Sequence, residues 1–328
     1  MTENKFIVRA APFLRTKEST KSIMWAVIIA LLPTALWSIY LYKFRAVSVI
    51  LLTIIFTEIF EIIFLKIRGK KNLWDTAFDG SAIVTGLLLA LNLPSTSPWW
   101  LCAVGGFIAM LLGKHVYGGL GNNPFNPALV ARVFLLLSFP TIMTTWTVGL
   151  SADVVSAATP LGIFSTEGAQ AVSNMNLWRL FIGLPVTVNG LPVGGGSIGE
   201  ISELAILAGG LLLMARKIIS PVIPIIYIAT VFIFTGIFHI INPEMYASPF
   251  FFMVTGGLFL GAFFMATDYV TTPLTVTGKI IFAGGCGLIT SLIRLFGAYP
   301  EGVSFAILIM NALTPTIDKY TNTRKFGG

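Results

Sequence analysis

Seven acidic residues stand inside or beside long apolar stretches of the sequence, where a charge is costly. The five that we take as candidates for a cation path are Glu58, Glu61, Asp79, Asp268 and Glu301; the other two are Glu200 and Glu203. Charges in such a setting usually have a functional or pairing role. Glu58 and Glu61 are one helical turn apart and share a helix face, so they could serve a cation path or pair with a neighbouring subunit. The alternative is a solvated or capping carboxylate near a span end.

Two further groups of polar residues carry chemistry of another kind. The segment Asp153–Thr159 ends directly before Pro160, and from its residue types alone it predicts an Asx or Ser turn. Asn123 and Asn126 precede Pro127, and their amides can both donate and accept hydrogen bonds. Asn126 and Pro127 also suit the start of a helix, so capping is the competing interpretation.

The composition restricts the elements that can position these residues. The sequence has 328 residues, of which 55% are hydrophobic and 11% are charged. Soluble domains carry about 25% charged residues, so this chain cannot cover a water-facing surface. Its net charge of +7 comes from Lys and Arg at the ends of apolar blocks, which is typical of membrane topology signals and argues against nucleic-acid binding. Cys102 and Cys286 lie in apolar segments without a CxxC or Cys/His cluster, so no metal site is predicted.

The hydropathy pattern predicts an all-α polytopic membrane protein with about ten spans. We place them at 22–42, 46–65, 79–93, 97–113, 127–139, 201–215, 220–238, 249–266, 279–296 and 302–317. Spans 79–93, 127–139 and 302–317 are shorter than the roughly 20 residues that cross a bilayer. We expect broken or half helices there, which membranes tolerate where they are buried in protein or line a cavity.

Basic residues orient these spans. With ten spans, the basic residues of the N-terminal tail (1–21), of the loop after the second span, of the loops after the fourth (Lys114) and sixth spans (Arg216 and Lys217), and of the C-terminal tail (318–328) fall on one side. The positive-inside rule makes that side cytoplasmic; Lys43 and Arg45 in a short outer turn are weak exceptions. The long segment 140–200 then lies outside, and a loop of this length is usually functional.

The sequence also repeats itself. Val84-Thr85-Gly86 in the third span matches Val254-Thr255-Gly256 in the eighth, and a Gly-, Pro- and Phe-containing stretch opens both the fifth and the tenth. This pattern divides the chain into two five-span units, 22–139 and 201–317, of opposite orientation. Inverted repeats with interrupted helices commonly build a central site. Chance similarity between Gly-rich apolar stretches is the alternative.

The spacing Asp-x-x-Ser-x-Ala-Thr in the outer segment resembles the flavinylation motif of the membrane subunits of Rnf complexes and sodium-pumping quinone reductases, the RnfD/NqrB family. In that family a flavin transferase joins the phosphate of FMN to the threonine hydroxyl. The resemblance makes Thr159 the acceptor, with Asp153, Ser156 and Ala158 as the rest of the motif. Ala157 stands where the family often has Gly.

The resemblance extends over nearly the whole chain. It includes stretches at 15–24, 118–128, 196–200, 268–273 and 299–303. The short N-terminal tail favours the D subunit of Rnf complexes over the longer NqrB. The resemblance also implies a fold like that of urea and ammonium transporters, with two inverted five-helix repeats.

The resemblance implies a function in electron transport. The chain would carry covalent FMN, and its partners would be the Rnf subunits A, B, C, E and G, in a bacterial inner membrane. The complex would couple electron transfer between ferredoxin and NAD to Na⁺ or H⁺ movement, with electrons arriving from the covalent FMN of the G subunit. The alternatives are an NqrB-like quinone-reductase subunit and a urea- or ammonium-type channel. No residue of the chain is expected to act as a catalyst alone, because the redox chemistry belongs to the cofactor.

A second, non-covalent flavin (riboflavin) is also implied, nearer the cytoplasmic side. Asn123 and Asn126 are our candidates for binding it, because amides can meet both edges of a flavin ring. Arg294, near the outer end of the ninth span, is a candidate partner for a flavin phosphate or for Glu301.

Overall fold

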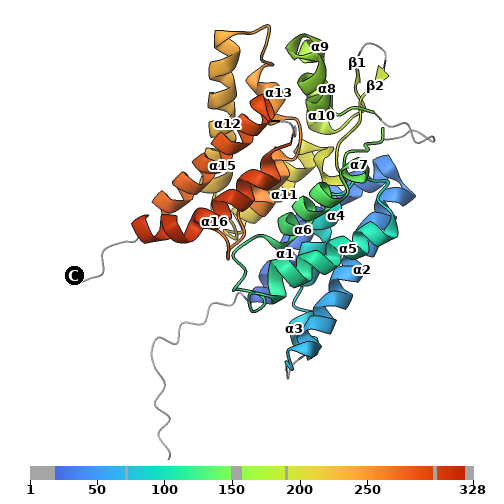
Figure 1. Ribbon diagram of the computed structural model, residues 1–328, viewed down its shortest axis with the longest axis vertical. Helices are drawn as coiled ribbons and strands as arrows, with labels where there is room; N and C mark the ends of the chain where they lie inside the picture. The colour runs from blue at the N-terminus through green and yellow to red at the C-terminus, as the bar shows by residue number, and fades with distance from the viewer. Residues whose placement is uncertain (1–18, 71–72, 149–156, 189–190, 298–300, 322–328) are drawn as a thin grey trace, which may run out of the picture.

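The structure is a computed structural model that describes residues 19–70, 73–148, 157–188, 191–297 and 301–321. Helices dominate it, with one short hairpin (Figure 1). The first part of the chain forms α1 (Thr20–Tyr42), α2 (Phe44–Ile67), α3 (Leu73–Ala77), α4 (Ser81–Leu91), α5 (Trp99–Met110), the π-helical turn η1 (Leu111–His115), α6 (Pro127–Ser138) and α7 (Pro140–Met143).

The middle of the chain folds into short elements and the last part returns to longer helices. The middle contains α8 (Pro160–Glu167), α9 (Ala169–Ser173), α10 (Leu177–Ile182), the antiparallel strands β1 (Thr187–Val188) and β2 (Leu191–Pro192), and the 3-10 turn η2 (Ile198–Glu200). The last part contains α11 (Glu203–Ala215), α12 (Val222–Ile241), α13 (Pro249–Met253), α14 (Leu258–Leu260), the π-helical turn η3 (Gly261–Met265), α15 (Val276–Phe296) and α16 (Val303–Thr321).

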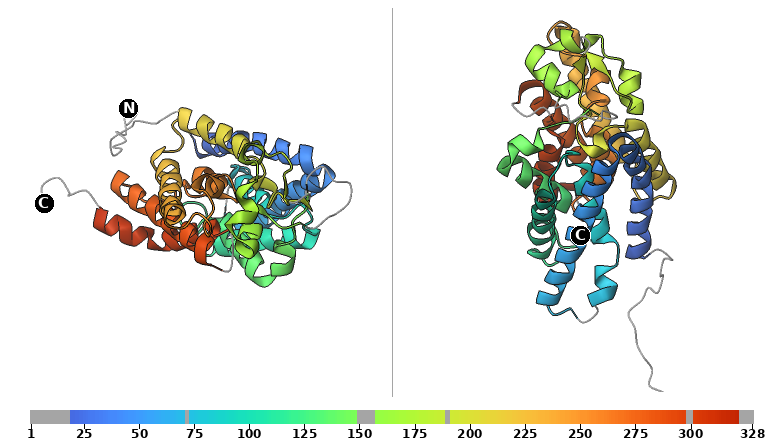
Figure 2. Two further views of the ribbon diagram at one scale, coloured as in Figure 1. Left: turned by 90° about the horizontal axis from the view of Figure 1, so that it is seen from above. Right: turned by 90° about the vertical axis from the view of Figure 1, so that its right-hand side faces the viewer.

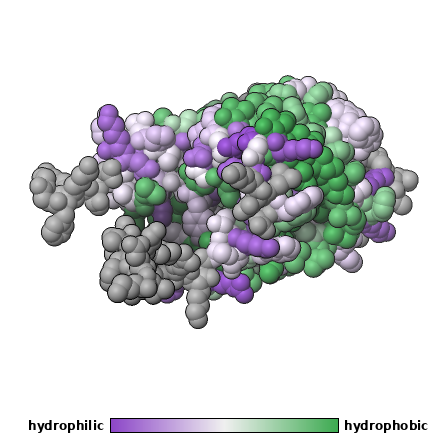
Figure 3. Space-filling view, turned by 90° about the horizontal axis from the view of Figure 1, so that it is seen from below, coloured by the Kyte–Doolittle hydropathy of each residue, from purple (hydrophilic) through white to green (hydrophobic). Residues whose placement is uncertain are grey.

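Four helices of the described chain are long and apolar enough to cross a membrane: α1, α2, α12 and α15. Shorter apolar helices accompany them, namely α4, α5 with η1, α6 and α11. Large apolar side chains such as Leu36 and Ile233 are exposed on the long helices. Broad hydrophobic areas are visible from below in Figure 3. Since water would not favour such a surface, the chain is a helical multi-pass membrane protein.

Helices cover each of the predicted spans, with two differences in continuity. The span predicted at 249–266 is divided into α13, α14 and η3, because Gly256 adopts a positive φ of 66° that ends the helical path. The short helix predicted at 302–317 is wrong: α16 has 19 residues and continues through Pro315 to Thr321. Proline is tolerated inside membrane helices where the surroundings satisfy the freed backbone group. The short helices predicted at 79–93 and 127–139 are α4, with 11 residues, and α6, with 12.

The helices pack in the same order in both parts of the chain. Helix α2 packs on α4 and α5, and α5 packs on α6; helix α12 packs on α13 and α15, and α15 packs on α16. The contact between α1 and α11 joins the two groups. Figure 2 shows α11, in yellow, beside the blue N-terminal helices. The polar residues described next lie where α4, α6, η2, α11, α15 and the start of α16 meet.

Candidate functional site

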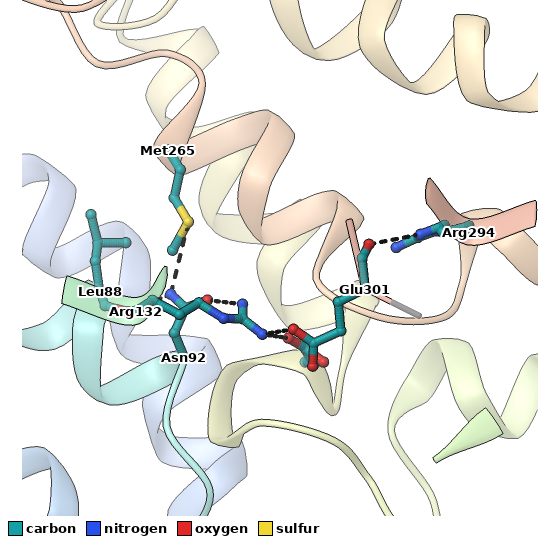
Figure 4. Close-up of polar contacts among 7 residues, drawn as sticks. Leu88, Asn92, Arg132, Met265, Arg294 and Glu301 are labelled. Atoms are coloured by element: carbon teal, nitrogen blue, oxygen red, sulfur yellow. Dashed lines mark hydrogen bonds and ion pairs between the residues drawn. The ribbon is translucent and has the colours of Figure 1, made fainter. Parts of the chain in front are cut away.

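A buried arginine in α6 forms the centre of a charge cluster. Arg132 is 3% exposed. Its guanidinium donates to the Asn92 side-chain oxygen, to the Glu301 carboxylate and, over 3.2 Å, to Glu200 Oε1 (Figure 4). Helix α6 begins at Pro127, and Asn126 Oδ1 accepts from the backbone N–H groups of Ala128 and Leu129. One cation thus binds two carboxylates that are distant in the sequence.

A second buried arginine lies on the other side of Glu301. Arg294 of α15 donates through Nε to the backbone carbonyl of Glu301 over 3.2 Å, and through Nη1 to that of Phe252 over 2.5 Å. Its Nη2 is buried without a partner among the described residues. Arg294 contacts Glu301 through its backbone carbonyl only, because the Glu301 carboxylate binds Arg132; pairing of Arg294 with a flavin phosphate stays a prediction.

The turn η2 and the start of α11 contribute two more carboxylates. Glu200 is 8% exposed and pairs with Arg132. Glu203 is the first residue of α11 and is fully buried, at 0% exposure. Both of its carboxylate oxygens lack a hydrogen-bond partner within the described chain. The cluster therefore contains one carboxyl group that no described donor satisfies.

Thr159 lies beside this cluster, at the start of α8. Its hydroxyl accepts from the Gly162 N–H over 3.1 Å, so it caps the helix. Backbone hydrogen bonds fix the end of the motif, from Ala157 N–H to the Trp146 carbonyl and from Gly194 N–H to the Ala158 carbonyl, each 3.0 Å long. Ala158 is exposed. The other two motif residues, Asp153 and Ser156, lie outside the described residues.

Thr159 borders two cavities. The larger has a volume of about 370 Å³ and is lined by Trp146, Phe305, Leu136, Ser304 and Glu301, among others. The smaller, of about 60 Å³, is lined by Tyr42, Glu200, Gly256 and Glu301, among others. The larger volume falls within the roughly 300–1,000 Å³ of ligand pockets, and its apolar and aromatic walls with few polar groups are typical of them. These lining residues would fit a flat aromatic group beside Thr159.

Asn123 and Asn126 line a third cavity, which shares no lining residue with the two cavities at Thr159. Both asparagines and Asp268 line it, but its volume is about 90 Å³. The Asn126 side chain is engaged, since Oδ1 caps α6 and Nδ2 donates to the Met265 carbonyl over 3.2 Å. Asn123 retains a buried Oδ1 without a partner among the described residues. This volume is below the roughly 300–1,000 Å³ of ligand pockets, so binding of the second flavin by these asparagines stays a prediction.

The remaining acidic candidates gather near the end of α2. Glu61 is 1% exposed, and its oxygens lie 2.8 Å from Lys114 Nζ and 2.8 Å from His115 Nε2. Lys114 also donates to Ser81 Oγ over 2.8 Å. Lys114 is 2% exposed, so counting it as a loop cation that marks topology is wrong, because it is the buried partner of Glu61.

Glu58 and Asp79 differ from Glu61 in their partners. Both oxygens of Glu58 are buried without a hydrogen bond from the described residues. Asp79 Oδ1 accepts from the Ser81 N–H over 2.7 Å at the start of α4, which is a capping contact. Glu58 and Glu61 thus lie on one helix but in different settings.

Sequence reasoning missed several residues of these clusters. Arg132, Asn92 and His115 were not among the candidates, and Lys114 was expected in a loop. Arg132 had a usable signal, because an arginine inside the apolar run of α6 needs an internal partner. No three His, Cys, Asp or Glu residues of the described chain come together in a way that could hold a metal ion.

The fold and the site define a helical multi-pass membrane protein with a buried charge cluster beside a cavity for a ligand. The chain belongs to the NQR2, RnfD, RnfE family, whose sequence profile matches residues 7–327. This confirms the resemblance seen in the motifs.

Three relatives illustrate the family. The chain is 44% identical to the D subunit of the proton-translocating ferredoxin:NAD(+) oxidoreductase complex of Clostridium ljungdahlii, over 99% of this chain and 97% of the relative. It is 44% identical to the D subunit of the Na(+)-translocating ferredoxin:NAD(+) oxidoreductase complex of Acetobacterium woodii, over 100% and 97%. It is 40% identical to the D subunit of the ion-translocating oxidoreductase complex of Stutzerimonas stutzeri, over 95% and 93%.

Proposed function

We propose that this protein is the flavin-carrying electron-transfer subunit of an Rnf-type ferredoxin:NAD oxidoreductase that couples electron flow to Na⁺ or H⁺ translocation. The names of the Clostridium and Acetobacterium relatives support membership of such a complex. The observation that carries the flavin part is the place of Thr159, which borders a cavity of about 370 Å³. FMN bound there supplies the redox chemistry, and the chain holds it.

The residues around Thr159 support this attachment. Thr159 is partly exposed, whereas the walls of the cavity are mainly apolar, with Trp146 and Phe305 as aromatic members. Ser304 Oγ is buried without a partner in the described chain and offers one polar contact to a ring edge. Esterification of the Thr159 hydroxyl leaves a lone pair on the same oxygen, so α8 can stay capped.

The test separates two roles of the Thr159 hydroxyl, which caps α8 and, in our proposal, forms the phosphate ester with FMN. Asn at this position keeps a good helix cap but has no hydroxyl for a phosphate ester. We expect Thr159→Asn in the assembled complex, produced together with a flavin transferase, to lose the covalent flavin fluorescence of the subunit band in a denaturing gel. Thr159→Ser should retain it.

The matched control is Thr166→Val, which removes an exposed hydroxyl from the same helix. This variant should keep the fluorescent band. A band that persists in Thr159→Asn contradicts the assignment of the acceptor.

We further propose the arrangement of the chain in the membrane. The equivalent packing order of the two helical groups supports two oppositely oriented five-span units. Basic residues at the span ends support cytoplasmic termini in a bacterial inner membrane, with Thr159 on the outer side. There it would meet the flavin transferase and the G subunit, among the Rnf subunits A, B, C, E and G. Asn123 and Asn126 remain our candidates for the second flavin, since Asn123 Oδ1 is buried without a partner among the described residues.

A further inference from the structure

Glu203 is a carboxyl group for which the described chain provides no counter-ion in contact. It is fully buried, and neither oxygen accepts a hydrogen bond from a described residue. Its electrostatic neighbours are Glu200 from η2 and Arg294 from α15. Glu200 carries the same charge as Glu203, and the Arg294 guanidinium donates to backbone carbonyls instead. An ionised carboxylate without donors is costly in an apolar interior.

The charges of the central cluster do not balance. It contains three carboxyl groups, of Glu200, Glu203 and Glu301, against the two guanidinium groups of Arg132 and Arg294. Arg132 pairs with both Glu200 and Glu301. If all five groups are ionised the cluster carries one net negative charge, and Glu203 is the carboxyl group without a hydrogen-bond donor among the described residues, so it is the group that a bound proton would neutralise.

We propose that Glu203, at the start of α11, is a proton-binding site of the translocation path. A divalent metal cation is the poorer occupant, since no three acidic, His or Cys side chains of the described residues come together there. A proton needs only one oxygen. The position of Glu203 at the N-terminus of α11 also stabilises its ionised form, so that the proton can be released as well as held.

A route for the proton runs through Glu200. This residue precedes Glu203 by three positions and lines the smaller cavity beside Thr159. The carboxyl O–H of Glu203 breaks, the proton passes through Glu200 or a water molecule to the cavity, and Glu203 remains as a carboxylate. Return of a proton reverses the step, so atoms and charge balance.

Arg294 links this step to the cavity. With Glu203 neutral, Arg294 donates to the carbonyls of Phe252 and Glu301, as in the structure, and its Nη2 has no partner among the described residues. When Glu203 ionises, its charge attracts the guanidinium. A Cβ atom on Gly256 would lie 2.8 Å from Nη2, and Gly256 lines the smaller cavity that Thr159 borders. A shift of Arg294 therefore reaches the smaller cavity beside Thr159.

The first experiment measures the proton itself, in the purified complex, by infrared difference spectroscopy. We expect the carbonyl-stretch band of a protonated carboxylic acid to be present in the native complex, to be absent in Glu203→Gln, and to move in Glu203→Asp. The control Glu244→Gln, in an exposed loop, should keep the band. Because this band needs neither flavin nor turnover, it remains informative if the flavin proposal fails.

The second experiment tests the role in translocation, which rests on the proposed function. In vesicles that contain the complex, we expect Glu203→Gln to move several-fold fewer protons per electron, whereas Glu244→Gln matches the native complex. Identical infrared spectra of the native and Glu203→Gln complexes would overturn the protonation of Glu203. An unchanged ratio of protons to electrons in Glu203→Gln would overturn its role in the path.

Discussion

At the scale of single residues, the dominant feature is a buried arginine that serves two glutamates. Arg132 contacts Glu200 and Glu301, and each of the three side chains is mostly removed from the surface. Buried ion pairs give little net stability, but removing one partner leaves a charge without compensation. The cluster therefore fixes the relative positions of α6, η2 and the start of α16 more than it strengthens the fold.

Arg132→Met leaves Glu200 and Glu301 without their cation. We expect this variant to lose about 3–5 kcal/mol of unfolding free energy, the usual effect of breaking a buried pair. Chemical unfolding in mixed micelles measures it. Adding Glu301→Gln should recover part of the loss, because one unpaired charge is removed. Arg179→Met, at an exposed position, is the control, and equal stability of the two single variants would contradict the prediction.

At the scale of elements, short and interrupted helices position the charged groups. Helix α6 begins at Pro127, and Asn126 caps its first turn while contacting the Met265 carbonyl of η3. One side chain thus joins the start of a helix to an element of the other helical group. The interruption between α13 and α14 provides the space at Gly256 that Arg294 approaches.

Asn126→Ala removes the cap of α6 and the contact with Met265 together. Loss of a cap of this type costs about 0.5–2 kcal/mol. Asn126→Asp keeps the cap but cannot donate to Met265, so we expect its unfolding free energy to lie between those of the native protein and Asn126→Ala. Unfolding in the same micelles gives the order. If Asn126→Asp is as destabilising as Asn126→Ala, the cap of α6 contributes nothing to the unfolding free energy.

At the scale of the whole molecule, the contact of α1 with α11 joins the two helical groups. It depends on small residues, since a Cβ atom on Gly209 would clash with the Ala30 carbonyl oxygen. Close approach through small residues is the usual way in which helices associate in membranes. Glu203 stands at the start of the same helix α11, so this contact also determines where the unpaired carboxyl lies.

Gly209→Ala therefore overpacks a backbone contact. We expect a loss of about 1–3 kcal/mol of unfolding free energy, the range for overpacked sites. Gly236→Ala, in α12, is the matched control, because its Cβ would meet only ordinary contacts at 3.9 Å. If Gly209→Ala is as stable as Gly236→Ala, α1 and α11 are not in close contact.

Much of the architecture was predictable from hydropathy, and part of the site was not. The apolar blocks located the helices, since the side chains of each block must be buried in lipid or in protein. The sequence did not predict that α16 continues through Pro315 or that the eighth span is divided at Gly256. Both features depend on how neighbouring elements pack around these residues. The capping role of Asn126 was one of two alternatives for its side chain, and Oδ1 does cap α6.

The sequence by itself determined the membrane class, the helical segments and the family. Composition and local motifs such as Asp153–Thr159 are properties of neighbouring residues and need no fold to be recognised. Only the tertiary structure decided which charges meet. Arg132 lies 68 positions from Glu200 and 169 from Glu301, and the buried pair of Lys114 and Glu61 spans 53 positions. In helices that are apolar on most faces, hydropathy does not specify which face meets which neighbour. The partner of a buried charge, and the absence of one for Glu203 among the described residues, therefore emerge only when the helices pack.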